Sequence, residues 1–210
     1  MINQELKKYI EENILPTYEK NDKGHNLEHI NYVTNRSLKF ADNIKDINYD
    51  MVYTIASYHD IAHHIDAKNH EKLSSEILMN DKNLKKFFDE EQIKIMAEAV
   101  YDHRASLETE PRSIYGKIIS SADRNTDIDN ILRRTYQYRI KHNPEYSLEE
   151  IIEESKQHII DKFGHKGYAV KKMYFKDLEY EKFLNDVKTL TEDNDLFIKR
   201  YKEVNNLDIK

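Results

Sequence analysis

Glycine and proline are scarce in this chain, and that scarcity limits the folds open to it. Only 4 Gly and 3 Pro occur among 210 residues. Tight hairpins between strands depend on residues such as glycine at their turn positions, so a sheet of many short strands is disfavoured. Lys, Glu, Leu and Ile are abundant instead, and three of these four are good helix formers. We therefore expect an all-α protein.

Apolar residues recur at helical spacing along most of the chain. The run at residues 51–56 predicts a helix with Asp50 as its N-cap, and the weakly periodic segment 61–69 predicts a loop or a short helical turn. The same spacing predicts other helices over residues 3–19 (with Pro16 near the end), 27–41, 70–79, 90–102, 113–122, 128–140, 148–163 and 177–204.

Composition excludes several classes of function. The 33 Lys and Arg against 39 Asp and Glu give a net charge of −6 with no basic block, which argues against binding a nucleic-acid polymer. No apolar stretch approaches the roughly 20 residues that span a bilayer, and the first residues lack the pattern of a signal peptide, so we expect a cytoplasmic protein without a membrane partner. Because the chain has no Cys, a transition metal would need nitrogen and oxygen ligands, and 10 His are present.

The dipeptide His59-Asp60 places an imidazole and a carboxylate side by side at the end of an apolar run. Each continues the apolar stripe of its helix, as do His29 and Asp123 on two other predicted helices. A helical bundle brings such faces together, so these four residues form a candidate metal site. For each residue alone the alternative is a hydrogen-bonded histidine or a salt-bridged aspartate.

The order of these residues resembles the HD superfamily of metal-dependent phosphohydrolases, whose pattern is a His, then a His-Asp pair, then a distant Asp. The matching segments are Gly-His-Asn-Leu-Glu-His at 24–29, Ala-Ser-Tyr-His-Asp-Ile-Ala at 56–62 and Ile-Ile-Ser-Ser-Ala-Asp-Arg at 118–124. The resemblance implies a single-domain helical bundle of the HD type. Residues 24–140 would form its metal-binding core, residues 1–23 an N-terminal helix packed on it, and residues 141–210 a helical extension that completes the same domain.

The resemblance also implies an activity. It predicts hydrolysis of a phosphoester or pyrophosphate bond in a nucleotide or a similar small phosphorylated metabolite, with a divalent ion (Mn, Fe, Co, Ni, Zn or Mg) held by His29, His59, Asp60 and Asp123. One ion is expected, and a second one, held by His70 and His103 and bridged through Asp60, is the open alternative.

His63 follows Asp60 by one helical turn, where related enzymes place an acid or base, so it joins Asp60 as a candidate catalytic residue. The alternative is a solvated loop histidine. Candidate contacts with substrate phosphate, each also explicable as an ordinary surface residue, are His25, His64, Lys68, Arg104 and Arg124.

The chain departs from the family at Asn26 and Tyr32, where many members have a carboxylate and an arginine. The signatures of alarmone hydrolases and cyclic-di-nucleotide phosphodiesterases are absent. A metal-containing domain that binds or senses a nucleotide without hydrolysing it is therefore the alternative function. A monomer and a homodimer are both compatible with the sequence.

Overall fold

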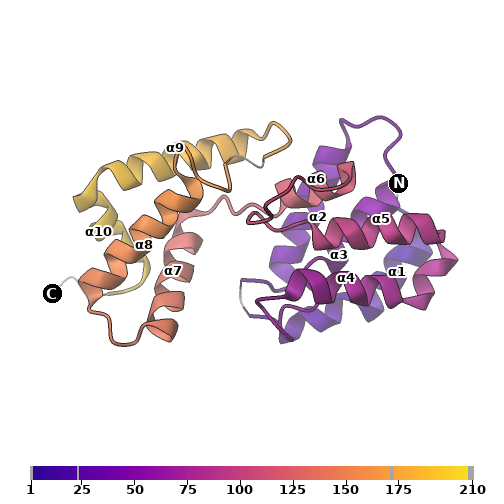
Figure 1. Ribbon diagram of the computed structural model, residues 1–210, viewed down its shortest axis with the longest axis horizontal. Coiled ribbons are helices and arrows are strands. Elements are labelled where there is room, and N and C mark those ends of the chain that lie inside the picture. The colour runs from indigo at the N-terminus through magenta and orange to yellow at the C-terminus, as the bar shows by residue number, and fades with distance from the viewer. Residues whose placement is uncertain (1, 23, 171–172, 208–210) are drawn as a thin grey trace. The chain divides into compact units, whose positions relative to one another are not determined.

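The computed structural model describes residues 2–22, 24–170 and 173–207, and every regular element among them is a helix. This confirms the predicted all-α class. The chain divides into two compact units, Met1–Asp123 and Arg124–Lys210 (Figure 1).

The first unit contains six α-helices and two short 3₁₀ helices in its described residues. Their bounds are α1 Gln4–Asn13, η1 Leu15–Lys20, α2 Leu27–Ala41, α3 Tyr49–Tyr58, α4 His70–Asn80, η2 Lys82–Lys86, α5 Glu90–Tyr101 and α6 Ile114–Ala122.

Helix α3 is the centre of this unit. It contacts α1, α2, α4, α5 and α6, and every residue from Met51 to Tyr58 is buried. Most of these residues are apolar, and the hydroxyls of Thr54 and Ser57 donate hydrogen bonds to carbonyls of the helix itself, so the helix can be buried on all sides. Polar side chains at the carboxyl end of α3 therefore emerge in the interior of the unit.

Two local features of the first unit differ from the sequence-based expectation. The helix predicted over residues 3–19 is α1 followed by η1, because Pro16 lacks an amide hydrogen and its ring obstructs continued α-helical bonding. The N-cap of α3 is Asn48, whose side chain accepts hydrogen bonds from the amides of Asp50 and Met51, so the assignment of Asp50 as the cap was wrong. Asp50 instead accepts a hydrogen bond from the Asn3 amide.

The second unit is a bundle of α7 Ile128–His142, α8 Leu148–Phe163, α9 Leu178–Glu192 and α10 Asn194–Val204. Each of these helices contacts the other three. Its interior combines aliphatic side chains with aromatic rings, among which Phe163 and Phe183 meet edge to face with centroids 5.0 Å apart. The single helix predicted over residues 177–204 is two helices, because Asp193 adopts an extended backbone and caps α10 by accepting a hydrogen bond from the Leu196 amide.

The boundary between the two compact units lies before α7. The predicted extent of the core, residues 24–140, stays a prediction. Ile131 and Leu132 of α7 are buried, and α7 contacts α8, α9 and α10, so this helix belongs to the second unit. The union of both units into one domain stays a prediction.

Among the described residues, none of the helices has both the length and the apolar character that crossing a bilayer requires.

Candidate metal centre

Asp60 is the pivot of the predicted site. It follows His59, the C-cap of α3, and its side chain is only 2% exposed. The Asp60 carbonyl accepts a hydrogen bond from the side-chain amide of Asn21 at 3.0 Å. Burial of a carboxylate is unfavourable unless cations or hydrogen-bond donors surround it, so the neighbours of its two oxygens decide what this residue can do.

One oxygen of Asp60 faces two of the predicted ligands. Its Oδ2 atom lies 3.5 Å from Nε2 of His29 and 3.4 Å from Nε2 of His59. Nε2 of His29 is also 3.3 Å from Oδ1 of Asp123, which caps the carboxyl end of α6. The donor atoms of His29, His59 and Asp123 lie within 4.8 Å of one another. The fold thus brings together all four residues that the sequence singled out.

The other oxygen of Asp60 faces two further histidines. Its Oδ1 atom is 3.1 Å from Nε2 of His70, at the start of α4, and 3.5 Å from Nε2 of His103, just beyond α5. The two Nε2 atoms are themselves 3.1 Å apart. Asp60, His70 and His103 form a second buried group of potential ligands. The carboxylate of Asp60 therefore separates two groups, one on each oxygen.

Backbone carbonyls orient three of these imidazoles. The Nδ1 atoms of His59, His70 and His103 lie 2.8, 2.9 and 2.6 Å from the carbonyl oxygens of the third residue before each, namely Ala56, Ala67 and Val100. A carbonyl only accepts, so each Nδ1 must carry the hydrogen and each Nε2 of a neutral ring presents a lone pair to Asp60. Histidines that bind metals are commonly oriented by a hydrogen bond of this kind.

These residues fit a bound cation. Nε2 of His29, Nε2 of His59 and Oδ1 of Asp60 are buried and have no partner with hydrogen-bond geometry in the described part of the chain. The Nε2 atoms of His70 and His103 face each other with their lone pairs, a repulsive contact unless a proton or a metal ion is placed between them. Imidazole nitrogen and carboxylate oxygen are suitable donors for Mn, Fe, Co, Ni and Zn ions.

Opposite charges in this cluster shift its pKa values. Burial lowers the pKa of His29, but the carboxylates of Asp123 and Asp60 outweigh burial and raise that pKa to about 9. Burial likewise opposes the charged form of His70, yet Asp60 raises the pKa of His70 above its usual value. Burial raises the pKa of Asp60, whereas the charge of His59 and the contacts with His103 and His29 hold it well below the usual range. Protons on His29 and His70 therefore compete with a metal ion for these sites.

His63 lies at the edge of this centre. Its ring stacks on that of His25, with centroids 3.6 Å apart, and its centroid is 5.1 Å from that of His70. Burial, followed by the nearby His25, lowers the pKa of His63 to about 4. His63 is therefore neutral at neutral pH, where it can accept a proton or bind a cation. Its predicted catalytic role stays a prediction.

The predicted substrate contacts have different surroundings. His25 stacks on His63, and both the backbone amide and the Nδ1 atom of His64 face Oδ1 of Asn21 at 2.9 and 3.1 Å. Arg104 donates hydrogen bonds to both carboxylate oxygens of Glu71 and to the carbonyl of Lys68, while the side chain of Lys68 is exposed. Arg124 is buried and follows Asp123 directly in the chain. Their contacts with substrate stay predictions.

Asn21 and Asp22 contribute to the centre although the sequence analysis does not single them out. The Asn21 side chain donates hydrogen bonds to the carbonyls of His25 and Asp60 and accepts one from the amide of His64, so it joins the loop before α2 to the loop after α3. Asp22 accepts hydrogen bonds from its own loop and faces His63. Spacing along a single sequence carries no signal for such contacts between loops, except that Asp22 precedes His25 by three residues.

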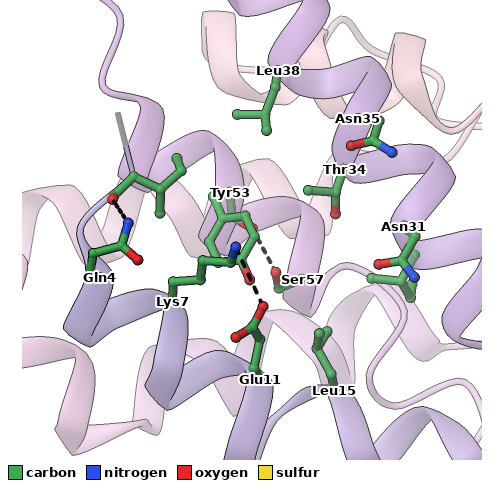
Figure 2. Close-up of a pocket in the computed structure, with 12 residues that line it drawn as sticks. Gln4, Lys7, Glu11, Leu15, Asn31, Thr34, Asn35, Leu38, Tyr53 and Ser57 are labelled. Atoms are coloured by element: carbon green, nitrogen blue, oxygen red, sulfur yellow. Dashed lines mark hydrogen bonds and ion pairs between the residues drawn. The ribbon is translucent and has the colours of Figure 1, made fainter.

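A pocket elsewhere in the first unit has a different character. It lies between α1, α2 and α3 and is lined by residues that include Lys7, Glu11, Asn31, Thr34 and Asn35 (Figure 2). Lys7 and Glu11 form an ion pair at 3.7 Å. None of the predicted ligands lines this pocket. The predicted ligands therefore lie at the carboxyl end of α3 and not at this pocket.

Comparison with known proteins agrees with this geometry. Residues 26–126 match the family model of the HD domain, and we assign this segment of the chain to that family. The fold is similar to the crystal structure of a predicted HD superfamily hydrolase from an uncultured Thermotogales bacterium, with a TM-score of 0.50 and 16% sequence identity over 95% of this chain and 91% of the other. A search of curated proteins gave no match.

The resemblance to the HD superfamily is thereby confirmed. The matched segment contains all four predicted ligands as well as His70 and His103. An HD domain with a buried His/Asp cluster supports a metal-dependent hydrolase in general terms. The structural neighbour supports the fold, and at this level of identity it carries no information on substrate.

Proposed function

We propose that this protein is a metal-dependent phosphohydrolase that cleaves a phosphoester or pyrophosphate bond in a nucleotide or a similar small phosphorylated metabolite. The observation that carries the proposal is the carboxylate of Asp60, buried between the Nε2 atoms of four histidines. When bound, a divalent ion at such a centre acts as a Lewis acid toward phosphate oxygens and makes water more acidic.

We further propose that the centre holds two ions. His29, His59 and Asp123 would bind the first with Oδ2 of Asp60, and His70 and His103 would bind the second with Oδ1. The two groups of ligands face different oxygens of Asp60, and both contain histidines whose Nε2 atoms present lone pairs. The Nε2 atoms of His70 and His103 are only 3.1 Å apart, which also supports this division.

The residues of the chain would orient substrate and water rather than form a covalent bond with the phosphate. His63 is neutral at neutral pH and lies beside His70, so its ring nitrogens would be available at the edge of the centre either to a proton of water or to a cation. Asn21 would hold the loops that carry His25 and Asp60 together through its two side-chain hydrogen bonds. Arg104 is held by Glu71, so a role for it in phosphate binding would require exchange of that ion pair for substrate.

The test is a screen of nucleoside mono-, di- and triphosphates with the metal-free protein reloaded with Mn²⁺, Co²⁺, Ni²⁺ or Mg²⁺. Phosphate or pyrophosphate release should require metal and should be abolished in His59→Ala and Asp60→Ala, while the exposed His165→Ala variant serves as a control. Circular dichroism should show that all variants are folded. Metal bound at the centre without turnover of any phosphate would overturn the enzyme and favour the alternative of a nucleotide-binding regulatory domain.

The number of ions is tested by metal analysis. His103→Ala should lose one equivalent of bound ion relative to the native chain, namely the ion on Oδ1 of Asp60. His29→Ala should also lose one equivalent, namely the ion on Oδ2. If His103→Ala retains the full metal content, the histidines on Oδ1 of Asp60 bind no ion and the two-ion proposal is wrong.

A further inference from the structure

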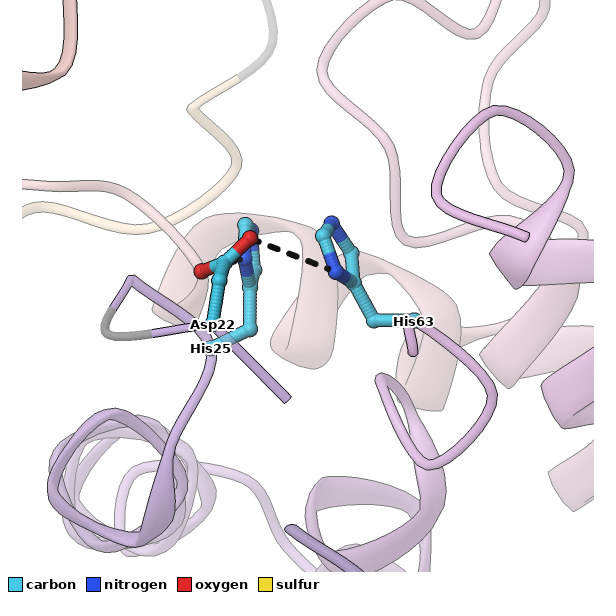
Figure 3. A group of neighbouring side chains, drawn as sticks. All are labelled: Asp22, His25 and His63. Atoms are coloured by element: carbon cyan, nitrogen blue, oxygen red, sulfur yellow. Dashed lines mark hydrogen bonds and ion pairs between the residues drawn. The ribbon is translucent and has the colours of Figure 1, made fainter. Parts of the chain in front are cut away.

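A third group of potential ligands lies at the edge of the centre and belongs to neither side of Asp60. It consists of Asp22 and His25, in the loop before α2, and His63, in the loop after α3 (Figure 3). Oδ1 of Asp22 is 2.9 Å from Nδ1 of His25, and Oδ2 is 3.6 Å from Nδ1 of His63. One carboxylate thus faces two imidazole nitrogens from two separate loops.

We propose that Asp22, His25 and His63 bind a further divalent transition-metal ion. Two nitrogen donors and one oxygen donor suit borderline ions such as Zn²⁺, Ni²⁺ and Co²⁺. The three donor atoms lie within 4.8 Å of one another. The proposed ion is distinct from those on Asp60, because all three of its ligands are different residues.

The distances fit a shared coordination sphere. Donors that each lie about 2.1 Å from an ion are about 3.0 Å apart at a right angle and about 3.4 Å apart at a tetrahedral angle. With both oxygens of Asp22 as ligands, the separations of 2.9 Å from Oδ1 to Nδ1 of His25 and 3.6 Å from Oδ2 to Nδ1 of His63 are close to these values. Small rotations of the side chains would therefore admit an ion without movement of the backbone.

The loops that carry these residues are fixed relative to each other. Asn21 donates hydrogen bonds to the carbonyls of His25 and Asp60, at 2.9 and 3.0 Å, and the amide of His63 bonds to that same Asp60 carbonyl at 3.0 Å. The rings of His25 and His63 stack with an interplanar angle of 22°. Fixed loops keep the ligands in place before an ion binds.

A purely structural role for Asp22 explains the contacts of only one of its two oxygens. As a loop cap it accepts a hydrogen bond from the Gly24 amide at 2.7 Å, and this uses Oδ1 alone. Oδ2 is too far from Nδ1 of His63 for a hydrogen bond, yet it faces that atom. The Asp22 side chain is 58% exposed, so an ion there would keep coordination positions open to solvent for water or a ligand oxygen.

The position of the group suggests a use for the ion. The ring centroid of His25 is 5.7 Å from that of His29, and the centroid of His63 is 5.1 Å from that of His70, so the group adjoins both sides of Asp60. If the proposed function holds, the added ion would bind a distal phosphate and favour nucleoside di- or triphosphates over monophosphates. The ion site itself does not depend on that function.

The experiment measures bound metal without substrate. Metal-free protein is dialysed against Ni²⁺ or Co²⁺ and its metal content is determined, for the native chain and for the double variant Asp22→Asn/His63→Gln. We expect the variant to lose one equivalent of ion. Two matched controls should keep the native content: Asp66→Asn, which alters another loop-capping carboxylate, and His165→Ala, which removes an exposed imidazole.

A second arm separates this site from the centre on Asp60. An Asp60→Asn variant should retain one equivalent of ion, and adding Asp22→Asn and His63→Gln should remove it, with circular dichroism confirming that both proteins are folded. Equal metal content in the native chain and in the double variant would overturn the proposal. Loss of turnover in His63→Gln with unchanged metal content would also overturn it, in favour of an acid or base role. A chain that hydrolyses no phosphate but loses the ion in the variant supports the site and contradicts only the proposed function.

Discussion

The two units of the molecule have different interiors. The interior of the second unit is mostly apolar, with aliphatic side chains and aromatic rings such as Phe163, Phe183 and Phe197. The hydroxyls of Ser155 and Tyr201 form a hydrogen bond of 2.8 Å there. The first unit buries ionisable side chains, with His59, Asp60 and His103 each at most 2% exposed. Buried charge destabilises a fold unless it is compensated, so the first unit retains groups that packing alone does not require.

This difference indicates where we expect the functional site. In the second unit, hydrophobic burial and ring packing explain the buried side chains. In the first unit, Nε2 of His29, Nε2 of His59 and Oδ1 of Asp60 have no hydrogen-bond partner in the described residues, and a bound cation would supply one. Substitutions can test this comparison. Those in the first unit should reduce metal binding and activity, and those in the second unit should reduce stability alone.

The largest effect is expected from Asp60→Asn. Loss of the carboxylate charge removes the ligand shared by both groups, so the bound metal should fall and phosphate release should drop by at least about 1,000-fold, which corresponds to about 4 kcal/mol in the activation free energy. The measurements are metal analysis and turnover of the best substrate from the nucleotide screen. Full metal content in the variant would show that Asp60 is not the pivot of the centre.

In the second unit, Phe183→Ala should reduce stability and leave metal content unchanged. Phe183 is 2% exposed and packs on Phe163 and Tyr180, so a cavity at this position should cost about 3–5 kcal/mol of unfolding free energy. Urea unfolding followed by far-UV circular dichroism gives this value, since the chain has no Trp. A parallel loss of metal under native conditions would contradict the separation of the two roles.

The pH dependence should distinguish the loaded and metal-free proteins. The pKa of His29 is raised to about 9 from an unfolded value of about 6.5, so its contribution to stability is complete below pH 6.5 and is lost as the pH rises through 9. The metal-free protein should therefore lose stability between about pH 6.5 and 9.

Metal binding should show the opposite trend. Because an ion must displace the proton of His29, its affinity should rise up to about tenfold per pH unit below pH 9 and then level off. Calorimetric titrations in buffers of different ionisation enthalpy count the released protons. Affinity that does not change between pH 7 and 9 would mean that His29 binds no ion.

The smallest effect comes from two buried serines, one in each unit. Ser155→Ala removes the hydrogen bond to Tyr201 and should cost about 1 kcal/mol of unfolding free energy. The Ser37 hydroxyl is buried without a hydrogen-bond partner in the described part of the chain, so Ser37→Ala should be neutral or slightly stabilising. Equal losses for the two variants in urea unfolding would remove this distinction.

Periodicity predicted the helices because the buried face of a helix requires apolar residues at helical spacing within its own sequence. The bounds of α2 and α8 agree with the predicted ranges of 27–41 and 148–163. The same stripes brought His29, His59, Asp60 and Asp123 together, since residues that continue a buried face end in the shared interior. The break at Asp193 escaped prediction because it lies in a polar run where spacing carries little information.

The finer organisation of the centre could not be predicted in this way. Which oxygen of Asp60 faces which histidine depends on side-chain rotation, and helical spacing does not determine it. The contacts of Asn21 and Asp22 join two loops far apart in sequence, and they depend on the tertiary fold. Loops have no period, so a turn signal predicts where the chain reverses and not what its side chains reach.

The hydrogen bonds from Nδ1 of His59, His70 and His103 to carbonyls three residues earlier have a kinetic consequence. These rings are oriented by their own backbone, so an arriving ion meets ligands that are already in position and has no chain segment to order. Removal and replacement of an ion should then proceed without unfolding, and one ion could be exchanged for another within the intact fold. The metal found in the protein would reflect which ions its surroundings supply.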